Sequence, residues 1–210
     1  MDTILQAIFL GIVQGLGEFI PISSSAHLII VPWLLQWNNP VLESLTFDVA
    51  LHIGTLVALL WFFAPEWVRL IRAMVASIVE RGIWVDAERR LAWYIVIGTI
   101  PGGIVGVLAE SMIEELFHQP NAPIQPTAMA VMGFILAFLG LLLFVAERMA
   151  RHTRGLEHVS LKDAILIGVA QAFAIFPGVS RSGSTITAGL ALGLQRETAA
   201  RFSFLLSAPI

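Results

Sequence analysis

The chain has 210 residues, of which 57% are hydrophobic and 13% charged, and its mean hydropathy is +0.84. A soluble core of this size would need more polar surface to cover it, so the composition excludes an ordinary globular domain and predicts an integral membrane protein. Because the chain has no cysteine, disulfides and thiolate metal sites are excluded as well. We expect no nucleic-acid partner.

Three segments are long and apolar enough to cross a bilayer, for which about 17–25 residues are needed. They are residues 47–64, 92–109 and 127–146. Asp48 and His52 interrupt the first, and Pro101 is predicted to kink the second. The predicted fold class is therefore all-α, a polytopic integral membrane protein.

Two shorter apolar segments, 3–17 and 164–176, each run into a proline and a serine-rich stretch, and another short apolar piece follows. Paired interrupted segments of this kind predict re-entrant helix hairpins around a site near the bilayer midplane. We expect these hairpins at 3–36 and 163–195. Non-helical backbone at that depth has to face protein or a water-filled cavity.

The basic residues divide the chain into sides. None occurs before Arg69, five lie in 65–91 and four in 148–162, whereas 110–126 carries only acidic charges. The positive-inside rule places 65–91 and 148–162 in the cytoplasm as loops, and 110–126 outside. The two hairpins then enter from opposite faces, which is the geometry of an inverted-topology repeat.

A weak internal similarity supports this duplication. GIVQGLGEFIPISSS (11–25) aligns with GVAQAFAIFPGVSR (168–181) after a one-residue gap. We expect a single membrane domain, 1–210, with repeat one at about 1–110 and repeat two at about 127–210. Since the second repeat stops within FSFLLSAPI, we expect it to lack C-terminal helices. The aligned pairs are Gly11 with Gly168, Gln14 with Gln171, Phe19 with Phe176, Pro21 with Pro177 and Ser24 with Ser180.

The tip of the first hairpin, QGLGEFIPISSSAH (14–27), gathers polar side chains. Gln14 and Glu18 are expected on one helix face, and Ser24 and His27 on one face of the next helix. A hydroxyl near an imidazole and a carboxylate has the parts of an activated nucleophile. Hydroxyls and free N–H groups at a helix start form an anion site. The further hydroxyls predicted to bind an anion here are Ser23 and Ser25.

The tip of the second hairpin, PGVSRSGST (177–185), surrounds Arg181, the one basic residue placed inside the membrane region. A guanidinium presents a rigid fork that matches phosphate oxygens. The small residues around it predict a nest of N–H and O–H donors. The expected phosphate ligands are Gly178, Ser180, Ser182, Gly183 and Thr185. Together the two tips suit a phosphate ester or anhydride of a lipid.

Structural explanations remain open for these side chains. Arg181 can bond buried carbonyls, serines can bond carbonyls one turn back, and His27 can bond a carbonyl of the opposite hairpin. We expect Gln14 and Gln171 to hydrogen-bond between the repeats. His52 and Asp48 are either supporting residues of the site or structural polar groups.

The two tips closely resemble the two signature motifs of the bacterial undecaprenyl-pyrophosphate phosphatases, also called bacitracin-resistance proteins. PGVSRSGST matches PGxSRSxxT at every fixed position, and the first tip fits (E/Q)xxxE followed by PxSSxxH. Gln14 stands where many members carry glutamate, and Ala26 where many carry glycine. The Lys-x6-Arg-Pro motif of the acid phosphatase-type lipid phosphatases is absent.

The resemblance implies hydrolysis of undecaprenyl diphosphate in the bacterial cytoplasmic membrane, which recycles the lipid carrier for peptidoglycan and confers bacitracin resistance. Glu18, Ser24, His27 and Arg181 fall on the family's proposed catalytic positions, and Gln14 on its first acidic position. The expected partners are this lipid substrate and membrane lipid, with a homodimer as an open arrangement.

Three points of the chemistry stay open at this stage. Either Ser24 or water is the nucleophile. We expect a divalent cation, Mg²⁺ or Ca²⁺, bound through the diphosphate with Glu18 as its carboxylate. The alternative function is an isoprenoid-lipid transporter or flippase, in which Glu18 carries a coupling proton and broken helices serve alternating access.

Overall fold

The computed structural model describes residues 2–117, 126–176 and 178–209. Within these residues the structure is helical, with no strand beyond an isolated bridge between Arg154 and Leu194. The all-α prediction is confirmed. The α-helices are α1 (Thr3–Phe19), α2 (Ser24–Leu34), α3 (Leu45–Phe62), α4 (Ala64–Val79), α5 (Ala87–Phe117), α6 (Pro126–Met149), α7 (Leu161–Ala172), α8 (Arg181–Ala191) and α9 (Arg196–Ser207), with 3-10 turns at Leu156–His158 and Phe173–Ile175.

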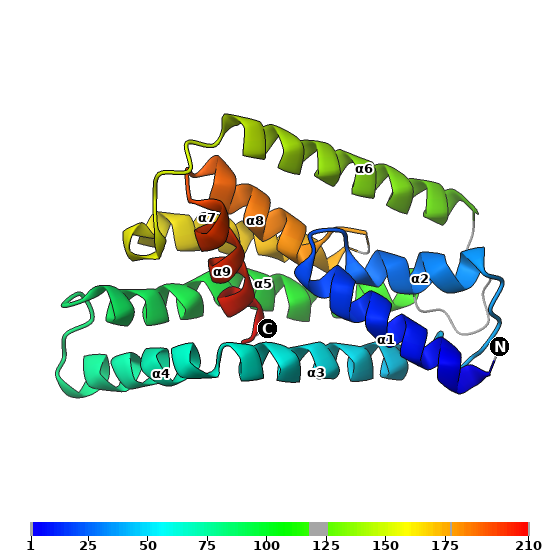
Figure 1. Cartoon of the computed structure of the whole chain (residues 1–210), viewed down its shortest axis with the longest axis horizontal. Coiled ribbons are helices and arrows are strands. Elements are labelled where there is room, and N and C mark those ends of the chain that lie inside the picture. Colours follow the sequence, from blue (N-terminus) through cyan, green and yellow to red (C-terminus); the bar gives the residue numbers. More distant parts are fainter. Residues whose placement is uncertain (1, 118–125, 177, 210) are drawn as a thin grey trace.

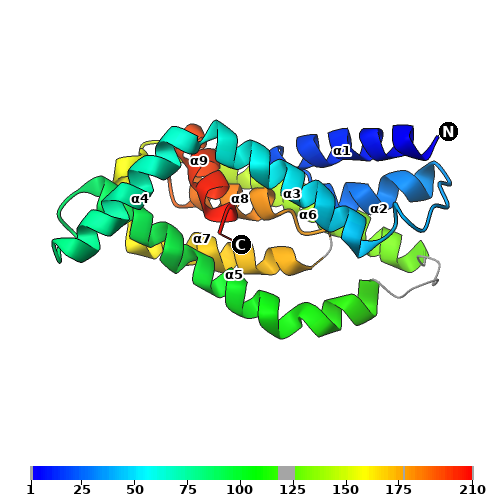
Figure 2. The same ribbon diagram turned by 90° about the horizontal axis from the view of Figure 1, so that it is seen from below.

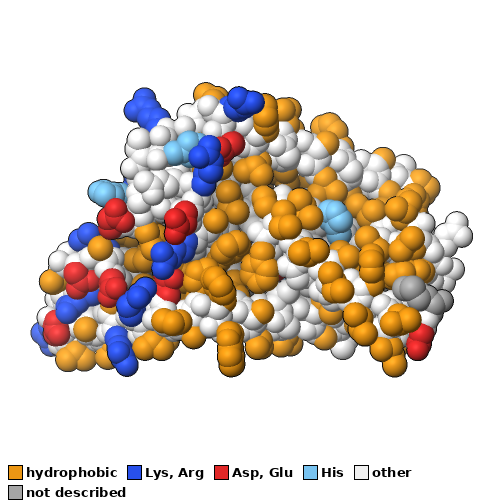
Figure 3. Space-filling view, viewed as in Figure 1, with side chains coloured by type: hydrophobic (Ala, Val, Ile, Leu, Met, Phe, Trp, Pro, Cys, Tyr) orange, Lys and Arg blue, Asp and Glu red, His pale blue; other side chains and the backbone are white. Residues whose placement is uncertain are grey.

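Among the described residues, three helices are long and apolar enough to cross a membrane, and they coincide with the three predicted spanning segments. They are α3, the Ala87–Ala109 part of α5, and α6, with mean hydropathies of 1.8, 1.9 and 2.7. Helix α5 continues through Pro101, and Figure 2 shows it changing direction along its length. Apolar side chains cover most of the face seen in Figure 3 away from the charged end. These features are those of a membrane protein.

The segment 65–91, predicted to be a loop, is mostly helical, and this prediction is wrong. Helix α4 occupies Ala64–Val79 with a proline in its first turn, where the missing N–H costs no hydrogen bond. Its buried face presents Glu66 and Leu70. Glu66 accepts a two-pronged hydrogen bond from Arg201 of α9, with N–O distances of 2.9–3.0 Å. Of the five arginines that suggested a loop, Arg69 and Arg72 lie on the exposed face of this amphipathic helix, and the other three follow its end.

Charged side chains gather at one end of the molecule. Figure 3 shows them over the end at which Figure 1 places the α4–α5 turn and the connection from α6 to α7. Both segments that the charge map assigned to one side therefore lie at the same end. The α2–α3 connection lies toward the opposite end, beside the N-terminus (Figure 1).

The core is built on a close crossing of α5 and α7. A Cβ atom added at Gly168 would meet the Gly98 carbonyl oxygen at 2.2 Å, and one at Gly98 would meet the Ala164 oxygen at 3.0 Å. Small residues allow such backbone contact between helices in lipid. Against this pair pack the buried side chains of α9, including Phe202, Leu205 and Leu206. Helices α7 to α9 are thereby held in a fixed orientation.

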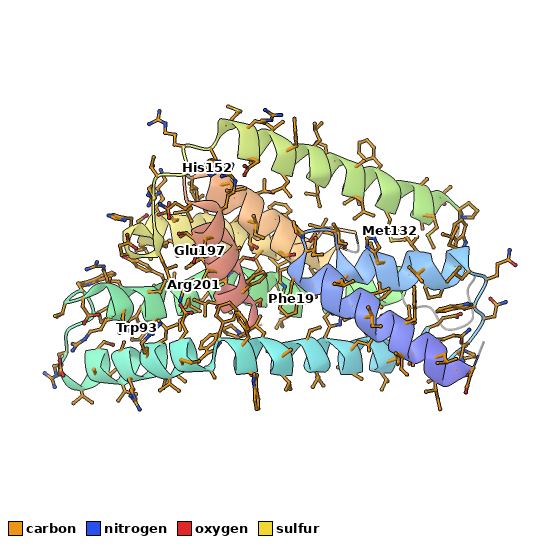
Figure 4. The ribbon with its side chains drawn as sticks, in the orientation of Figure 1. Phe19, Trp93, Met132, His152, Glu197 and Arg201 are labelled. Atoms are coloured by element: carbon orange, nitrogen blue, oxygen red, sulfur yellow. The ribbon has the colours of Figure 1, made fainter. Side chains whose placement is uncertain are left out.

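Two short-helix pairs bring their tips together. The α1–α2 turn reaches the start of α8, where a Cβ atom at Gly183 would lie 3.4 Å from the Pro21 carbonyl oxygen. The side chain of Phe19, labelled in Figure 4 at the end of α1, meets Phe204 of α9 edge-on at 5.6 Å. The chain therefore forms two helix–turn–helix units whose tips touch; that they are re-entrant in a membrane stays a prediction.

Arg154 fastens the connection between α6 and α7. Its guanidinium donates to the Leu192 carbonyl oxygen at 3.0 Å and to both oxygens of Asp163, whose side chain is 3% exposed. Asp163 also accepts from the N–H and hydroxyl of Ser160, each at 2.7 Å, in a capping box that starts α7. Burial alone would raise the pKa of Asp163, but the hydrogen bonds from Arg154 and Ser160 outweigh it and lower that pKa.

This cluster predicts a pH-dependent stability. Because the pKa of Asp163 is lowered in the folded state, its contribution is full above the ordinary aspartate range and is lost as pH falls through the folded-state value. Asp163→Asn should cost about 2 kcal/mol at neutral pH, less than the roughly 3–5 kcal/mol of a fully buried pair, because Arg154 is one-third exposed. Thermal unfolding in detergent from pH 7 down to about pH 2 measures both effects.

The matched control is Glu157→Gln, since this carboxylate is 63% exposed. Its melting temperature should follow that of the parent at every pH. An Asp163→Asn protein as stable as the parent at pH 7 would show that the Arg154 cluster does not hold this connection.

Candidate active site

Glu18 lies in the last turn of α1, directly under the start of α2. The two helices approach so closely that a Cβ atom at Gly17 would lie 2.9 Å from the Ser24 Cα atom. Only glycine fits there without displacing backbone. The approach brings the Ser24 hydroxyl to 2.8 Å from Glu18 Oε2, to which it donates a hydrogen bond.

Ser23 holds the turn between these helices in an uncommon backbone conformation. It is the N-cap of α2, with φ 69° and ψ 92°, and its side chain makes no capping hydrogen bond. A non-glycine residue at positive φ costs about 1–3 kcal/mol and persists only when its surroundings impose it. His27 helps to do so, because its Nδ1 lies 2.8 Å from the Ser23 carbonyl oxygen and donates to it.

The start of α8 supplies the opposing side. Ser180 caps the helix by accepting from the Gly183 N–H at 3.0 Å. Its hydroxyl is also 3.3 Å from that of Ser182. Gly178, at φ 93°, makes the turn before this cap. The resulting geometry projects Arg181, the first residue of α8, toward the end of α1.

Four side chains converge on the Glu18 carboxylate. Arg181 Nη2 pairs with Oε1 across 163 residues of sequence. Ser24 donates to Oε2, and Gln14 Nε2 donates to the same oxygen at 3.2 Å. His52 Nε2 of α3 lies 3.9 Å from it. Both carboxylate oxygens are therefore engaged, and the arginine and the carboxylate balance each other's charge.

A cavity of about 580 Å³ opens onto this cluster. Its polar floor is the cluster together with neighbouring hydroxyls, and its wall is apolar, made by α3 and the segment before α8. Val49 and Ile53 of this wall are about half exposed, at 48% and 55%. The site residues on the floor are Glu18, Ser23, Ser24, Ser25, His52, Ser180, Arg181 and Ser182.

Other predicted residues lie outside this lining. Thr185 is buried and turned toward α9, 2.6 Å from the Ser203 hydroxyl and 2.8 Å from the Arg181 carbonyl oxygen. The N–H of Gly183 is already used by Ser180. His27 hydrogen-bonds to the Ser23 carbonyl oxygen of its own hairpin, and not to a carbonyl of the opposite hairpin as one expectation had it. Gln14 reaches the site only through Glu18, and Pro177 lies outside the described residues.

The expected hydrogen bonds of Gln14 and Gln171 between the repeats are wrong. Gln14 bonds within α1, and its Oε1 atom has no partner. Gln171 of α7 is 3% exposed, and neither atom of its amide has a partner among the described residues. Buried amides are nearly always satisfied. Gln171 is among the residues beside the cavity, but both polar atoms of its amide are enclosed.

The residues present offer little to a metal ion held by protein alone. The described residues contain no cluster of three or more histidine, aspartate and glutamate side chains arranged for a metal. Glu18 already has Arg181 on one oxygen and two donors on the other. This donor set fits a cation bound chiefly by phosphate oxygens, with Glu18 as the protein carboxylate.

The cluster has the parts for phosphoryl transfer. The Ser24 hydroxyl is hydrogen-bonded to the Glu18 carboxylate, which can accept its proton. The Arg181 guanidinium beside them can bind phosphoryl oxygens and stabilise their charge. The apolar wall suits a substrate whose remaining part is hydrocarbon. Of the supporting groups, Glu18, Ser24 and Arg181 were expected from sequence, whereas nothing in the sequence placed His52 beside Glu18.

Comparison with known proteins gives a consistent picture. The family model "Bacitracin resistance protein BacA" matches residues 7–210. An undecaprenyl-diphosphatase of Pelotomaculum thermopropionicum is 50% identical over 99% of this chain and 72% of the relative. One of Moorella thermoacetica is 49% identical over 99% and 73%. "Undecaprenyl-diphosphatase 2" of Stutzerimonas stutzeri is also 49% identical, over 99% and 73%.

The contact between Gly17 and Ser24 yields a stability prediction. Gly17→Ala inserts a methyl group against backbone and should lower the free energy of unfolding by about 1–3 kcal/mol, the usual cost of overpacking. Gly15→Ala is the control, because its Cβ atom would meet nothing within 4 Å and alanine favours the helix. Melting in detergent, followed by tryptophan fluorescence, should rank Gly15→Ala at or above the parent and Gly17→Ala below it. Equal melting temperatures for the two variants would contradict the close approach of α1 and α2.

Proposed function

Because the chain belongs to the bacitracin resistance protein family BacA, we propose that it hydrolyses undecaprenyl diphosphate to undecaprenyl phosphate and phosphate at the Glu18–Arg181 site. This reaction recycles the lipid carrier for peptidoglycan synthesis and confers bacitracin resistance. The observation that carries the proposal is the pairing of Arg181 from one helix pair with Glu18 from the other, with Ser24 on the same carboxylate.

The ion pair explains how substrate would activate the site. Arg181 pairs with Glu18, and a carboxylate paired with a guanidinium is a poorer proton acceptor than a free one. A diphosphate brings more negative charge and a better match to the guanidinium fork than one carboxylate does. Substrate therefore takes Arg181, and Glu18 is released to accept the proton of Ser24, which it already contacts.

Ser24 then attacks the terminal phosphorus. The bond from its Oγ atom to phosphorus forms while the bond to the bridging oxygen breaks, and undecaprenyl phosphate leaves with the electron pair. Arg181 stabilises the charge on the phosphoryl oxygens, the main protein contribution in such reactions. Water next releases phosphate from Ser24. The direct attack of water, assisted by Glu18, is the competing route.

We also propose roles for the neighbouring hydroxyls, for His27 and for a divalent cation. Ser23, Ser25, Ser180 and Ser182 face the pocket and would bind the diphosphate. His27, expected to move protons, contacts the Ser23 carbonyl instead, and its role in proton transfer stays a prediction that the activity of His27→Gln tests. A divalent cation would be held by Glu18 and substrate oxygens and would neutralise charge; activity that survives exhaustive chelation argues against it.

The environment we propose is the bacterial cytoplasmic membrane, with several spans and an inverted repeat. Supporting this are the helix–turn–helix units with touching tips and the basic segments gathered at one end. Because the chain has no cysteine, single-cysteine variants report topology cleanly. An impermeant maleimide on intact cells should label Asn38→Cys and spare Arg81→Cys; the reverse pattern argues against this orientation.

Arg181 provides the test of the proposed activity. Arg181→Ala should reduce kcat/KM on undecaprenyl diphosphate by about 10²–10³-fold, the usual loss when one charge-stabilising donor is removed. Arg181→Lys keeps the charge without the fork and should fall between that variant and the parent. Phosphate release in detergent micelles is the measurement. Arg196→Ala is the control, because Arg196 pairs with Glu147 away from the pocket.

Micelles also separate the phosphatase from the transporter, since they sustain no gradient. A purified chain that releases no phosphate, but moves isoprenoid lipid across liposomes, would replace the phosphatase by the flippase alternative.

Ser24 decides between the two nucleophiles. Rapid acid quench during turnover should trap phosphoserine in the parent and none in Ser24→Ala, whose turnover should fall to background because the attacking oxygen is gone. Ser25→Ala is a matched control one residue away, and it should keep the phosphoserine on Ser24. Full turnover by Ser24→Ala would establish water as the nucleophile.

A further inference from the structure

The imidazole that the structure brings to the reacting carboxylate is that of His52. Among the described residues, His52 is the histidine within 4 Å of Glu18: its Nε2 atom lies 3.9 Å from Glu18 Oε2. His52 lines the cavity and its side chain is 45% exposed, whereas His27 is absent from the lining. The ring therefore reaches both the carboxylate and the space in which a substrate would sit.

Its tautomer follows from its other contact. His52 Nδ1 lies 2.7 Å from the Asp48 carbonyl oxygen, one turn back on α3. A carbonyl can only accept, so Nδ1 carries the proton of the neutral ring. The lone pair of the neutral imidazole is then on Nε2, the atom that faces Glu18. This arrangement presents a base to the carboxylate.

The proposed reaction needs such a base. Glu18 takes the proton of Ser24 in the first half of the reaction, and hydrolysis of the phosphoserine requires a second proton to be taken, from the attacking water. One carboxylate cannot accept both unless it loses the first in between. Arg181, the other charged group on Glu18, cannot accept a proton.

We propose that His52 is a catalytic residue that takes from Glu18 the proton delivered by Ser24 and releases it to solvent before phosphoserine is hydrolysed. The inference rests on the proposed phosphatase function and on Ser24 as its nucleophile. The 3.9 Å separation closes to a hydrogen bond by a movement of about 1 Å, and catalytic hydrogen bonds are commonly long before substrate binds.

The protons and bonds balance through both halves. In the first, the Ser24 Oγ–P bond forms, the bond to the bridging oxygen breaks, and the proton passes from Oγ to Glu18 Oε2 and on to His52 Nε2. In the second, water bonds to phosphorus, Glu18 accepts its proton and returns it to Ser24 Oγ, and the P–Oγ bond breaks. The proton lost through His52 is the net proton of anhydride hydrolysis.

The charges around the ring fit this sequence. Glu18 of α1 and Arg181 of α8 face His52 across the cavity, and Asp48 of its own helix also lines it. Glu18 stabilises the imidazolium at the moment when Arg181 is engaged by phosphate. Because the ring lines the cavity, the cavity gives its proton a route out of the site.

The test uses the full chain with undecaprenyl diphosphate in detergent micelles. His52→Gln cannot carry a proton, so we expect a burst of undecaprenyl phosphate equal to the enzyme concentration, followed by steady turnover about 10²-fold slower than in the parent. Phosphoserine should accumulate, and KM should stay within about threefold. Added imidazole should speed the turnover of His52→Ala at least tenfold and leave Ser24→Ala inactive.

His158→Gln is the control, since His158 pairs with Glu157 outside the cavity, and it should behave as the parent. The inference is overturned if His52→Gln turns over within threefold of the parent. It is equally overturned if burst and steady rate fall together at the parent's melting temperature, or if imidazole fails to rescue a folded His52→Ala. A parent that releases no phosphate would instead overturn the proposed function.

Discussion

The ion pair between Arg181 and Glu18 joins the tips of the two short-helix pairs. Removing either partner of a buried ion pair lowers the free energy of unfolding by about 3–5 kcal/mol, because the other charge is left buried without a partner. The Glu18 side chain is only 10% exposed, so its carboxylate depends on the arginine that comes from 163 residues further along the chain. The same contact that holds the two tips together therefore defines the pocket between them.

The pairing of these two charges has a chemical consequence. With Arg181 bound to Glu18, the positive charge of the guanidinium is already compensated by a carboxylate. A ligand must bring enough negative charge to replace the carboxylate on the guanidinium, which favours phosphate groups over carboxylates. Replacement also frees the carboxylate that Ser24 already contacts. Selectivity and activation thus come from one exchange of partners.

Sequence patterns predicted the parts of the fold that depend on hydrophobicity alone. The spans α3, α5 and α6 follow from length and composition, and the breaks after α1 and α7 follow from proline and serine-rich turns. Helix α4 was missed because its arginines were interpreted as markers of a loop. An amphipathic helix carries such residues on its outer face, and what decides its existence is the partner for its buried face, here Glu66 with Arg201.

Contacts of the candidate site were predictable where they follow from the spacing of residues along one helix or from the position of a helix tip. Gln14 and Glu18 lie one turn apart and do meet, and Arg181 at the second tip does reach the first. Spacing cannot give the rotation of one helix against another. Thr185 lies one turn from Arg181, yet its hydroxyl meets Ser203, because α9 covers that side of α8.

The two histidines show the same limit most clearly. His27 lies in a conspicuous motif close to Ser24, but its position three residues along α2 turns it to the backbone of its own hairpin. His52 lies in a spanning segment with no motif around it, and it faces Glu18 only because α3 packs beside α1. Proximity along the chain is a poor guide to a proton's route. The route is set by which helix supplies the wall opposite the carboxylate, and in this molecule that helix is α3.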